Sequence, residues 1–185
     1  IFATRRSPRG ARTPSRRDGR AAIVASVDRL DFVGVAKALL QNALDEARAL
    51  HCRVIDIELS DGGIRVSDDG QGIPISPHPR SGRALLEVVM MGPRRGPKNT
   101  LAQVNAHCLW LEAEIHRDGM LWYQRYDFAQ PTAPVQQRGE ATHRGTTITC
   151  APACGDPLSF DRLRELVHEL TQAEPGVKVK VRLRD

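Results

Sequence analysis

The chain has 185 residues, of which 41% are hydrophobic and 26% charged, values that are ordinary for a globular protein with one core. It contains no run of 18 apolar residues, so we expect no membrane-spanning helix. Its four cysteines lack the paired spacing of a zinc site, which favours reduced cysteines in an intracellular, cytoplasmic protein.

The net charge of +5 is concentrated at the N-terminus, where residues 1–20 carry seven arginines and one acid. Residues 1–22 also lack apolar periodicity, so we expect a disordered tail followed by one domain over residues 23–185. A solvated linker is the favoured interpretation of the tail. An organelle transit segment and a DNA-binding arm at residues 5–20 are the alternatives. The nearly neutral remainder lacks the basic footprint of a DNA-binding domain.

Apolar periodicity and turn signals predict helices alternating with hairpins. A long amphipathic helix is expected from Ser26 or Asp28, the latter as its cap, to about Leu50, and Asp118-Gly119 is expected to close a hairpin. The other predicted helices cover 83–91, 100–107 and 160–173. The predicted strands lie within 53–68, 109–115, 121–126, 146–150 and 177–183, and residues 129–144 are predicted to be loop. This order indicates an α+β fold with helices on one sheet face.

The most informative segment is Asp68-Asp69-Gly70-Gln71-Gly72-Ile73-Pro74, here called the glycine box, which follows the first predicted hairpin. Its glycines allow the backbone to approach a flat ligand closely. The Asp68 carboxylate is a pure acceptor, suited to an exocyclic amino group such as that of adenine. Because glycine after aspartate is also ordinary turn chemistry, the glycine box alone does not decide between a turn and a ligand site.

A second motif lies in the long predicted helix. Asn42, Asp45 and Glu46 fall at three- and four-residue spacing and therefore share one helical face. Such a stripe is usually a solvated face, but here it precedes a hairpin that ends in the glycine box, an order that is uncommon by chance.

Together these motifs resemble the GHKL ATP-binding domains of the DNA gyrase B and topoisomerase IV type, from about Val33 to Asp185. The segments that carry the resemblance are Asn42–Ala47, His51-Cys52, the glycine box, Leu86–Met90, Gly145–Thr147, Leu163–Leu166 and Pro175–Val177. The resemblance implies the two-layer Bergerat fold. In that fold a mixed, mostly antiparallel sheet carries helices on one face, and the nucleotide lies between them.

The resemblance also implies roles for individual residues. Asn42 would ligate the Mg²⁺ that bridges the phosphates, Asp68 would hydrogen-bond adenine, and Thr146 would support adenine or its bound water. For Val66 and Ile148, a role in the hydrophobic core is as good an interpretation as contact with the nucleotide. The nucleotide-binding residues that the resemblance implies are Asn42, Asp45, Glu46, Val66, Asp68, Gly70, Gly72, Ile73, Pro74, Val89, Met90, Thr146 and Ile148.

The sequence departs from the family pattern at the positions that matter for hydrolysis. Ala38 stands where the family has its general-base glutamate, and Gln71 replaces the arginine that pairs with Glu46. The chain also passes from Met91 to Thr100 without the family's glycine-rich, phosphate-wrapping lid. We therefore expect no catalytic residue here, with ATP binding, and the Mg²⁺ that accompanies it, weak or lost.

Three functions remain open from the sequence. The first is a gyrase B-like binding or regulatory module, impaired or inactive in ATP hydrolysis, with a topoisomerase or DNA-associated partner. The second is the ATPase domain of a type II DNA topoisomerase, completed by missing segments or by a partner. The third is a nucleic-acid-binding protein that uses the Arg-rich tail.

Overall fold

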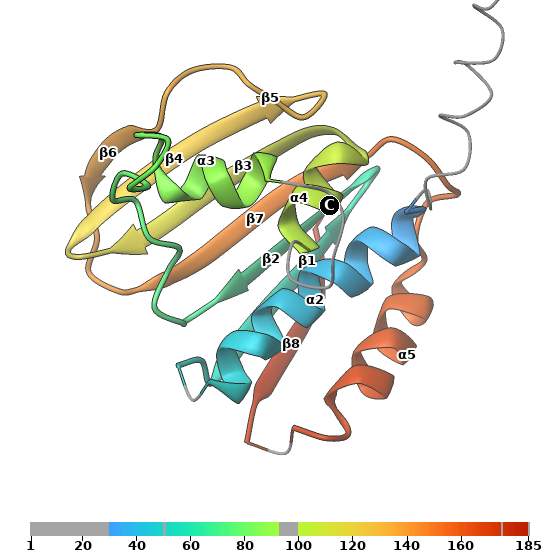
Figure 1. Ribbon diagram of the computed structural model, residues 1–185. Coiled ribbons are helices and arrows are strands. Elements are labelled where there is room, and N and C mark those ends of the chain that lie inside the picture. Colours follow the sequence, from blue (N-terminus) through green and yellow to red (C-terminus); the bar gives the residue numbers. More distant parts are fainter. Residues whose placement is uncertain (1–29, 50, 93–99, 175, 185) are drawn as a thin grey trace, which may run out of the picture.

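The computed structural model describes residues 30–49, 51–92, 100–174 and 176–184 (Figure 1). The predicted tail at residues 1–22 lies outside these residues, so that expectation stays a prediction. In the described part of the chain, no helix is long and apolar enough to cross a membrane.

One eight-stranded sheet forms the first layer, in the order β5-β4-β3-β7-β2-β1-β8, with β6 also paired to β4. Of the pairs, β1 with β8 is parallel and the others are antiparallel. The strands are β1 (Val54–Ser60), β2 (Gly63–Asp68), β3 (Cys108–Arg117), β4 (Met120–Asp127), β5 (Gln130–Pro131), β6 (Gln136–Glu140), β7 (Gly145–Pro152) and β8 (Lys178–Leu183).

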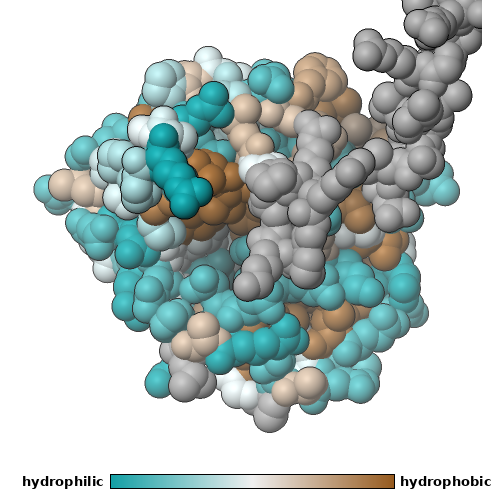
Figure 2. Space-filling model, viewed as in Figure 1, coloured by the Kyte–Doolittle hydropathy of each residue, from teal (hydrophilic) through white to brown (hydrophobic). Residues whose placement is uncertain are grey.

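The second layer consists of helices on one face of this sheet (Figure 1). They are α2 (Phe32–Arg48), α3 (Leu85–Met91), α4 (Thr100–Ala106) and α5 (Phe160–Thr171). Apolar residues reach the surface in the region of α3 (Figure 2), where Val88, Val89 and Met91 are only partly buried. The predicted α+β, two-layer fold with a mostly antiparallel sheet is confirmed.

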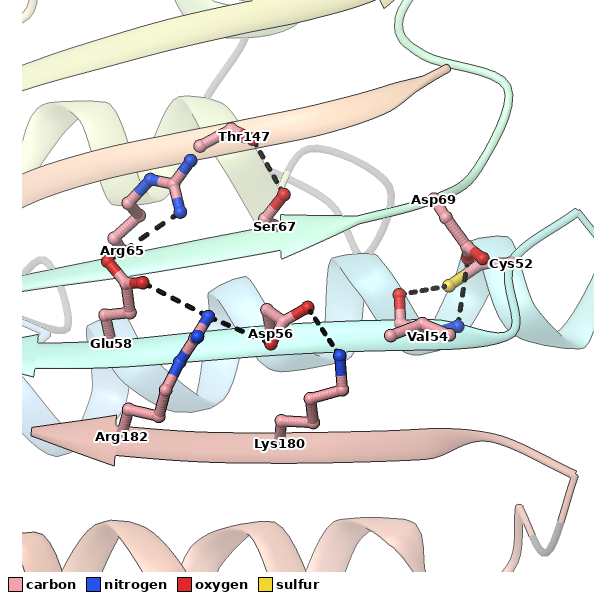
Figure 3. A network of polar contacts seen from close by, with 10 residues as sticks. All are labelled: Cys52, Val54, Asp56, Glu58, Arg65, Ser67, Asp69, Thr147, Lys180 and Arg182. Atoms are coloured by element: carbon pink, nitrogen blue, oxygen red, sulfur yellow. Dashed lines mark hydrogen bonds and ion pairs between the residues drawn. The ribbon is translucent and has the colours of Figure 1, made fainter. Parts of the chain in front are cut away.

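The two sheet faces differ because side chains alternate along each strand. In β1, Ile55 and Ile57 are buried under the helices. Asp56 points to the other face, where its carboxylate lies 3.1 Å from the Arg182 guanidinium and 3.6 Å from Lys180 of β8 (Figure 3). Such exposed pairs add little stability, but they mark the polar face of the sheet.

The long predicted helix begins later than expected. Asp31 is its N-cap, and the Asp31 carboxylate accepts a hydrogen bond of 2.7 Å from the N–H of Gly34. The predicted start at Ser26 or Asp28 is therefore wrong for α2, because Asp31 supplies the cap. Gly34 does not interrupt the helix, since its N–H is the group that the cap satisfies.

The predicted loop at 129–144 is also wrong in part, because it contains β5 and β6. All five residues of β6 are exposed and the strand has no apolar alternation, so the signal used to find strands is missing. The hairpin around Asp118-Gly119 is confirmed, with φ of 55° and 76° at these two residues, as a tight hairpin turn requires.

Candidate functional site

The candidate site is centred on Asp68, the last residue of β2. Its Oδ1 accepts hydrogen bonds from the N–H of Gly70 at 2.9 Å and of Thr146 at 3.3 Å. Its Oδ2 has no hydrogen-bond partner among the described residues, so one carboxylate oxygen is fixed and the other can accept from a ligand. Asp68 is only 8% exposed, and this burial raises the pKa of its carboxyl to about 6 despite the two N–H donors.

Glycines permit the close packing around this carboxylate. A Cβ on Gly70 would lie 2.7 Å from Asp68 Oδ1, and a Cβ on Gly145 would overlap the carbonyl oxygen of Asp68. Gly145 also has a φ of 142°, which side-chain-bearing residues rarely adopt. The end of β2 and the start of β7 therefore meet backbone to backbone, and this contact brings Thr146 to Asp68.

The second aspartate of the glycine box contacts the start of β1. Asp69 Oδ1 accepts from the N–H of Arg53 at 2.7 Å and of Val54 at 2.9 Å, as Figure 3 shows for Val54. Burial alone would raise the pKa of the Asp69 carboxyl, but these two N–H donors stabilise the ionised form and hold the pKa below its usual range. Asp69 thus ties the first half of the glycine box to β1.

The polar stripe of α2 divides into members with different surroundings. Asn42 is half-buried and its side chain makes no hydrogen bond within the described residues. Asp45 is exposed and paired with Arg48 at 2.8 Å, away from the glycine box. Glu46 lies beside the box, with its Oε2 3.1 Å from the position of a Gly70 Cβ. This oxygen is buried without a hydrogen-bond partner in the described part of the chain, although His51 Nδ1 lies 3.7 Å away.

The apolar residues among the predicted nucleotide-binding residues lie mostly in the core. Val66 and Ile148 are paired in register on β2 and β7 and are 5% and 2% exposed. Met90 is fully buried, whereas Val89 and Ile73 are partly buried and Pro74 is exposed. Apart from the exposed Pro74, these side chains have a packing role in the structure, and contact of any of them with a ligand stays a prediction.

The far end of the site is formed by α2, α3 and α4. Ala38 is 7% exposed and lies one helical turn before Asn42. The connection from α3 to α4 spans only residues 92–99. The buried Asn105 of α4 holds the two helices together, because its Nδ2 donates to the Met90 carbonyl at 3.0 Å. Among the described residues, no group of three or more His, Cys, Asp or Glu side chains could hold a metal ion.

The structure adds residues that the sequence reasoning did not single out as site residues. Arg117, at the end of β3, donates from Nη1 to the carbonyl oxygens of Gly72 at 2.6 Å and Gln71 at 3.2 Å. Gly145 fits against Asp68 as described above. A glycine that directly precedes Thr146 was a usable signal, whereas no local pattern marks Arg117 as a neighbour of the glycine box.

A groove of about 600 Å³ lies elsewhere, between α5 and β8, where Phe160, Val167 and Val179 contribute to its lining. None of the predicted site residues lines this groove. Hydrogen-bond chemistry, rather than cavity size, therefore identifies the corner at Asp68 as the candidate site.

Comparison with known proteins finds relatives among the DNA gyrase B proteins. No protein-family model matches the sequence. The chain is 35% identical to the DNA gyrase B protein of Thermotoga maritima over 164 residues, covering 77% of this chain and 25% of that protein. It is 37% identical to the DNA gyrase B protein of Treponema pallidum over 125 residues, covering 60% and 20%. The chain thus spans about a quarter or less of these relatives.

Solved structures with the same fold include the 43K ATPase domain of Thermus thermophilus gyrase B in complex with an aminocoumarin. The TM-score is 0.79 and the identity 25%, with 91% of this chain and 48% of that chain covered. The topoisomerase IV ATP-binding domain of Francisella tularensis, in complex with a small-molecule inhibitor, also has a TM-score of 0.79, at 23% identity, with 90% and 89% covered.

Proposed function

Since this chain belongs to the GHKL ATP-binding domains of the DNA gyrase B type, we propose that it is an adenine-nucleotide-binding module with little or no ATP hydrolysis. Asp68 Oδ2 accepts the amino group of the base, while Gly70 and Thr146 hold the carboxylate in place. The apolar side chains of Val66 and Ile148 form the floor beside it.

The observation that carries the loss of hydrolysis is Ala38. A buried methyl group on α2, one turn before Asn42, cannot accept a proton from an attacking water. General-base catalysis is worth roughly 10²–10⁴-fold in rate, so its loss alone nearly silences the reaction. The short connection between α3 and α4 supports the same conclusion, because it leaves little chain to surround phosphates.

Mg²⁺ fits only as part of the nucleotide complex. Magnesium in nucleotide sites takes few protein ligands and completes its shell with phosphates and water. The amide oxygen of Asn42, which has no hydrogen-bond partner among the described residues, is suited to be that single protein ligand. When bound, the ion would supply charge neutralisation of the phosphates, and Asn42 would hold it on α2.

We further propose a binding or regulatory role beside a type II topoisomerase or another DNA-associated protein, since the relatives are gyrase and topoisomerase components. An ATPase completed by a partner is the competing proposal. It requires a catalytic base from outside, because position 38 lies within this chain and holds alanine.

Calorimetric titration with ATP, ADP, adenosine and an aminocoumarin, with and without Mg²⁺, tests the proposal. We expect ATP and adenosine to bind with affinities within about tenfold of each other, because few charge-assisted phosphate contacts are available. Asp68→Ala is the matched control and should abolish binding of both. ATP binding at least about a hundredfold tighter than adenosine would reveal a phosphate site and contradict the proposal.

The seven arginines of residues 1–20 favour DNA binding as a second activity. Each phosphate contact steepens the salt dependence of DNA affinity. Deleting residues 1–22 should therefore flatten that dependence and remove most of the binding in a salt titration with duplex DNA. Equal binding by the truncated chain would refute this role for the tail.

A further inference from the structure

The two halves of the glycine box are held by different parts of the fold. The first half is fixed twice, through Asp68 with the N–H of Thr146 and through Asp69 with the start of β1. The second half, from Gln71 onward, leaves the sheet. Gln71 and Pro74 are exposed, and Ile73 is the partly buried side chain of this half that packs against the core.

Arg117 of β3 reaches this second half directly. A Cβ on Gly72 would lie 3.0 Å from the carbonyl oxygen of His116 and 3.2 Å from that of Gly145, so the box lies against the end of β3. At this contact Arg117 Nη1 donates to the carbonyl oxygens of Gly72 at 2.6 Å and Gln71 at 3.2 Å. Hydrogen bonds from a charged donor are stronger than neutral ones, which makes this contact a substantial anchor.

No comparable anchor comes from α2 within the described residues. Glu46 Oε2 is buried beside Gly70 but has no hydrogen-bond partner there. The neighbouring Gln71 side chain makes no hydrogen bond among the described residues either. His51 Nδ1, 3.7 Å from Glu46 Oε2, is not part of the box, and Gln71 is uncharged, so among the described residues no ion pair joins Glu46 to the box.

We propose that Arg117 is a positioning residue that holds the second half of the glycine box, supplying from β3 the anchor that α2 does not provide. Arg117 acts on the carbonyl oxygens of the box, and through them it keeps Gly70 in place against Asp68. The effect on ligand affinity rests on the proposed nucleotide-binding function, whereas the effect on the mobility of the box does not.

Hydrogen exchange followed by mass spectrometry tests the anchor without any ligand. In Arg117→Ala, exchange in peptides covering residues 68–76 should accelerate by about tenfold or more, which corresponds to the loss of one hydrogen bond to a charged group. Arg125→Ala is the matched control, since Arg125 lies on β4 and pairs with Glu112 and Asp127 instead. It should leave these peptides unchanged. Should Arg117→Ala fail to fold, Arg117→Lys, which keeps the charge with fewer donor directions, should show a smaller acceleration of the same peptides.

A second substitution on the α2 side of the box distinguishes a positioning role of Arg117 from a general contribution of Arg117 to stability. Adding Gln71→Arg to Arg117→Ala creates a partner for Glu46 and should return exchange to within about threefold of the parent, whereas further adding Glu46→Gln should remove the rescue. Unchanged exchange in Arg117→Ala, or an acceleration that Gln71→Arg leaves unaltered, overturns the proposal. Titration of the same variants with adenosine should follow the exchange rates. If exchange behaves as expected but the parent binds no adenosine, the nucleotide-binding proposal fails and the anchor stands.

Discussion

The two ends of the candidate site are held by different kinds of contact. At the end that would receive the base, Asp68 is fixed by the N–H groups of Gly70 and Thr146 and packed against Gly145. At the end that would receive phosphates, Asn42 has no hydrogen-bond partner among the described residues and Ala38 offers only a buried methyl group. Among the described residues, polar contacts are therefore in place at the proposed base end, and few polar groups lie at the proposed phosphate end.

Under the proposed function, this difference would explain how a site loses one activity and keeps another. The base end depends on backbone contacts between β2 and β7, which are also contacts of the sheet itself. In the family that the sequence resembles, catalysis would depend on single side chains such as the one at position 38, and on the segment between α3 and α4. Alanine in place of a glutamate at position 38 lacks only a base, whereas a side chain at Gly145 of the base end would disturb the contact between β2 and β7.

The largest effect is expected from Gly145→Ala. The added Cβ overlaps the Asp68 carbonyl oxygen and occupies a φ of 142°, so steric overlap and backbone strain add. We expect a loss of at least about 3 kcal/mol in the free energy of unfolding. Urea unfolding measures it, and Gly176→Ala, where a Cβ would meet nothing within 4 Å, is the control. Similar midpoints for the two variants would mean that β2 and β7 are not in close contact.

Asp68→Asn should separate stability from binding. Burial raises the Asp68 pKa from 3.8 to about 6, so the folded state favours the protonated form and loses stability as pH rises from about 4 to above 6. The amide of the variant does not ionise, so the variant does not lose stability as the pH rises. Its free energy of unfolding at pH 7.5 should therefore exceed that of the parent by up to about 3 kcal/mol. Adenosine binding should weaken by about tenfold or more, because a donor replaces the free acceptor oxygen.

Urea unfolding at pH 7.5 and pH 4 checks the stability difference, which should nearly vanish at the lower pH. A variant that is less stable than the parent at pH 7.5 would contradict the burial of a charged Asp68. Asp69→Asn is an instructive contrast. Asp69 accepts from Arg53 and Val54 with a lowered pKa, so its neutral variant should lose stability at neutral pH.

The sequence predicted the fold wherever apolar periodicity was strong. The helix within 26–50, the hairpins and the last strand are confirmed, and each has regularly spaced apolar residues, although those of β8 are only partly buried. The strands β5 and β6 were missed because exposed polar strands carry no such pattern. For the site, Asp68 and Thr146 were predicted and the structure brings them together. These two residues, 78 positions apart, were assigned to the site by the family resemblance and not by spacing. Arg117 was not predicted, because its contact with Gly72 joins residues 45 positions apart and no motif quoted for the resemblance includes it.

The pH dependence of adenosine binding tests whether the Asp68 carboxylate is the acceptor at the base end. Only the ionised Asp68 offers two acceptor oxygens, and its pKa is raised to about 6. Adenosine affinity should therefore be constant above pH 7 and fall about tenfold per pH unit well below pH 6. Calorimetry between pH 4.5 and 8 measures this profile. Asp68→Asn should show a weaker, flat profile, and a flat profile in the parent would exclude Asp68 as the ligand acceptor.

The smallest change is expected from Ala38→Glu. A carboxylate at this position restores a proton acceptor one turn before Asn42, and a base acting on a well-placed water is worth roughly 10²–10⁴-fold. That gain requires phosphates held in a fixed position, because catalysis depends on the geometry of the reacting atoms. With Asn42 as the main phosphate-side group in the described residues, we expect ATP turnover to stay within about tenfold of the parent. Ala38→Gln is the matched control, since it has a similar shape and cannot act as a base. A large rise in phosphate release with Ala38→Glu and none with Ala38→Gln would show that the phosphate end is intact, and that a single side chain separates this chain from an active ATPase.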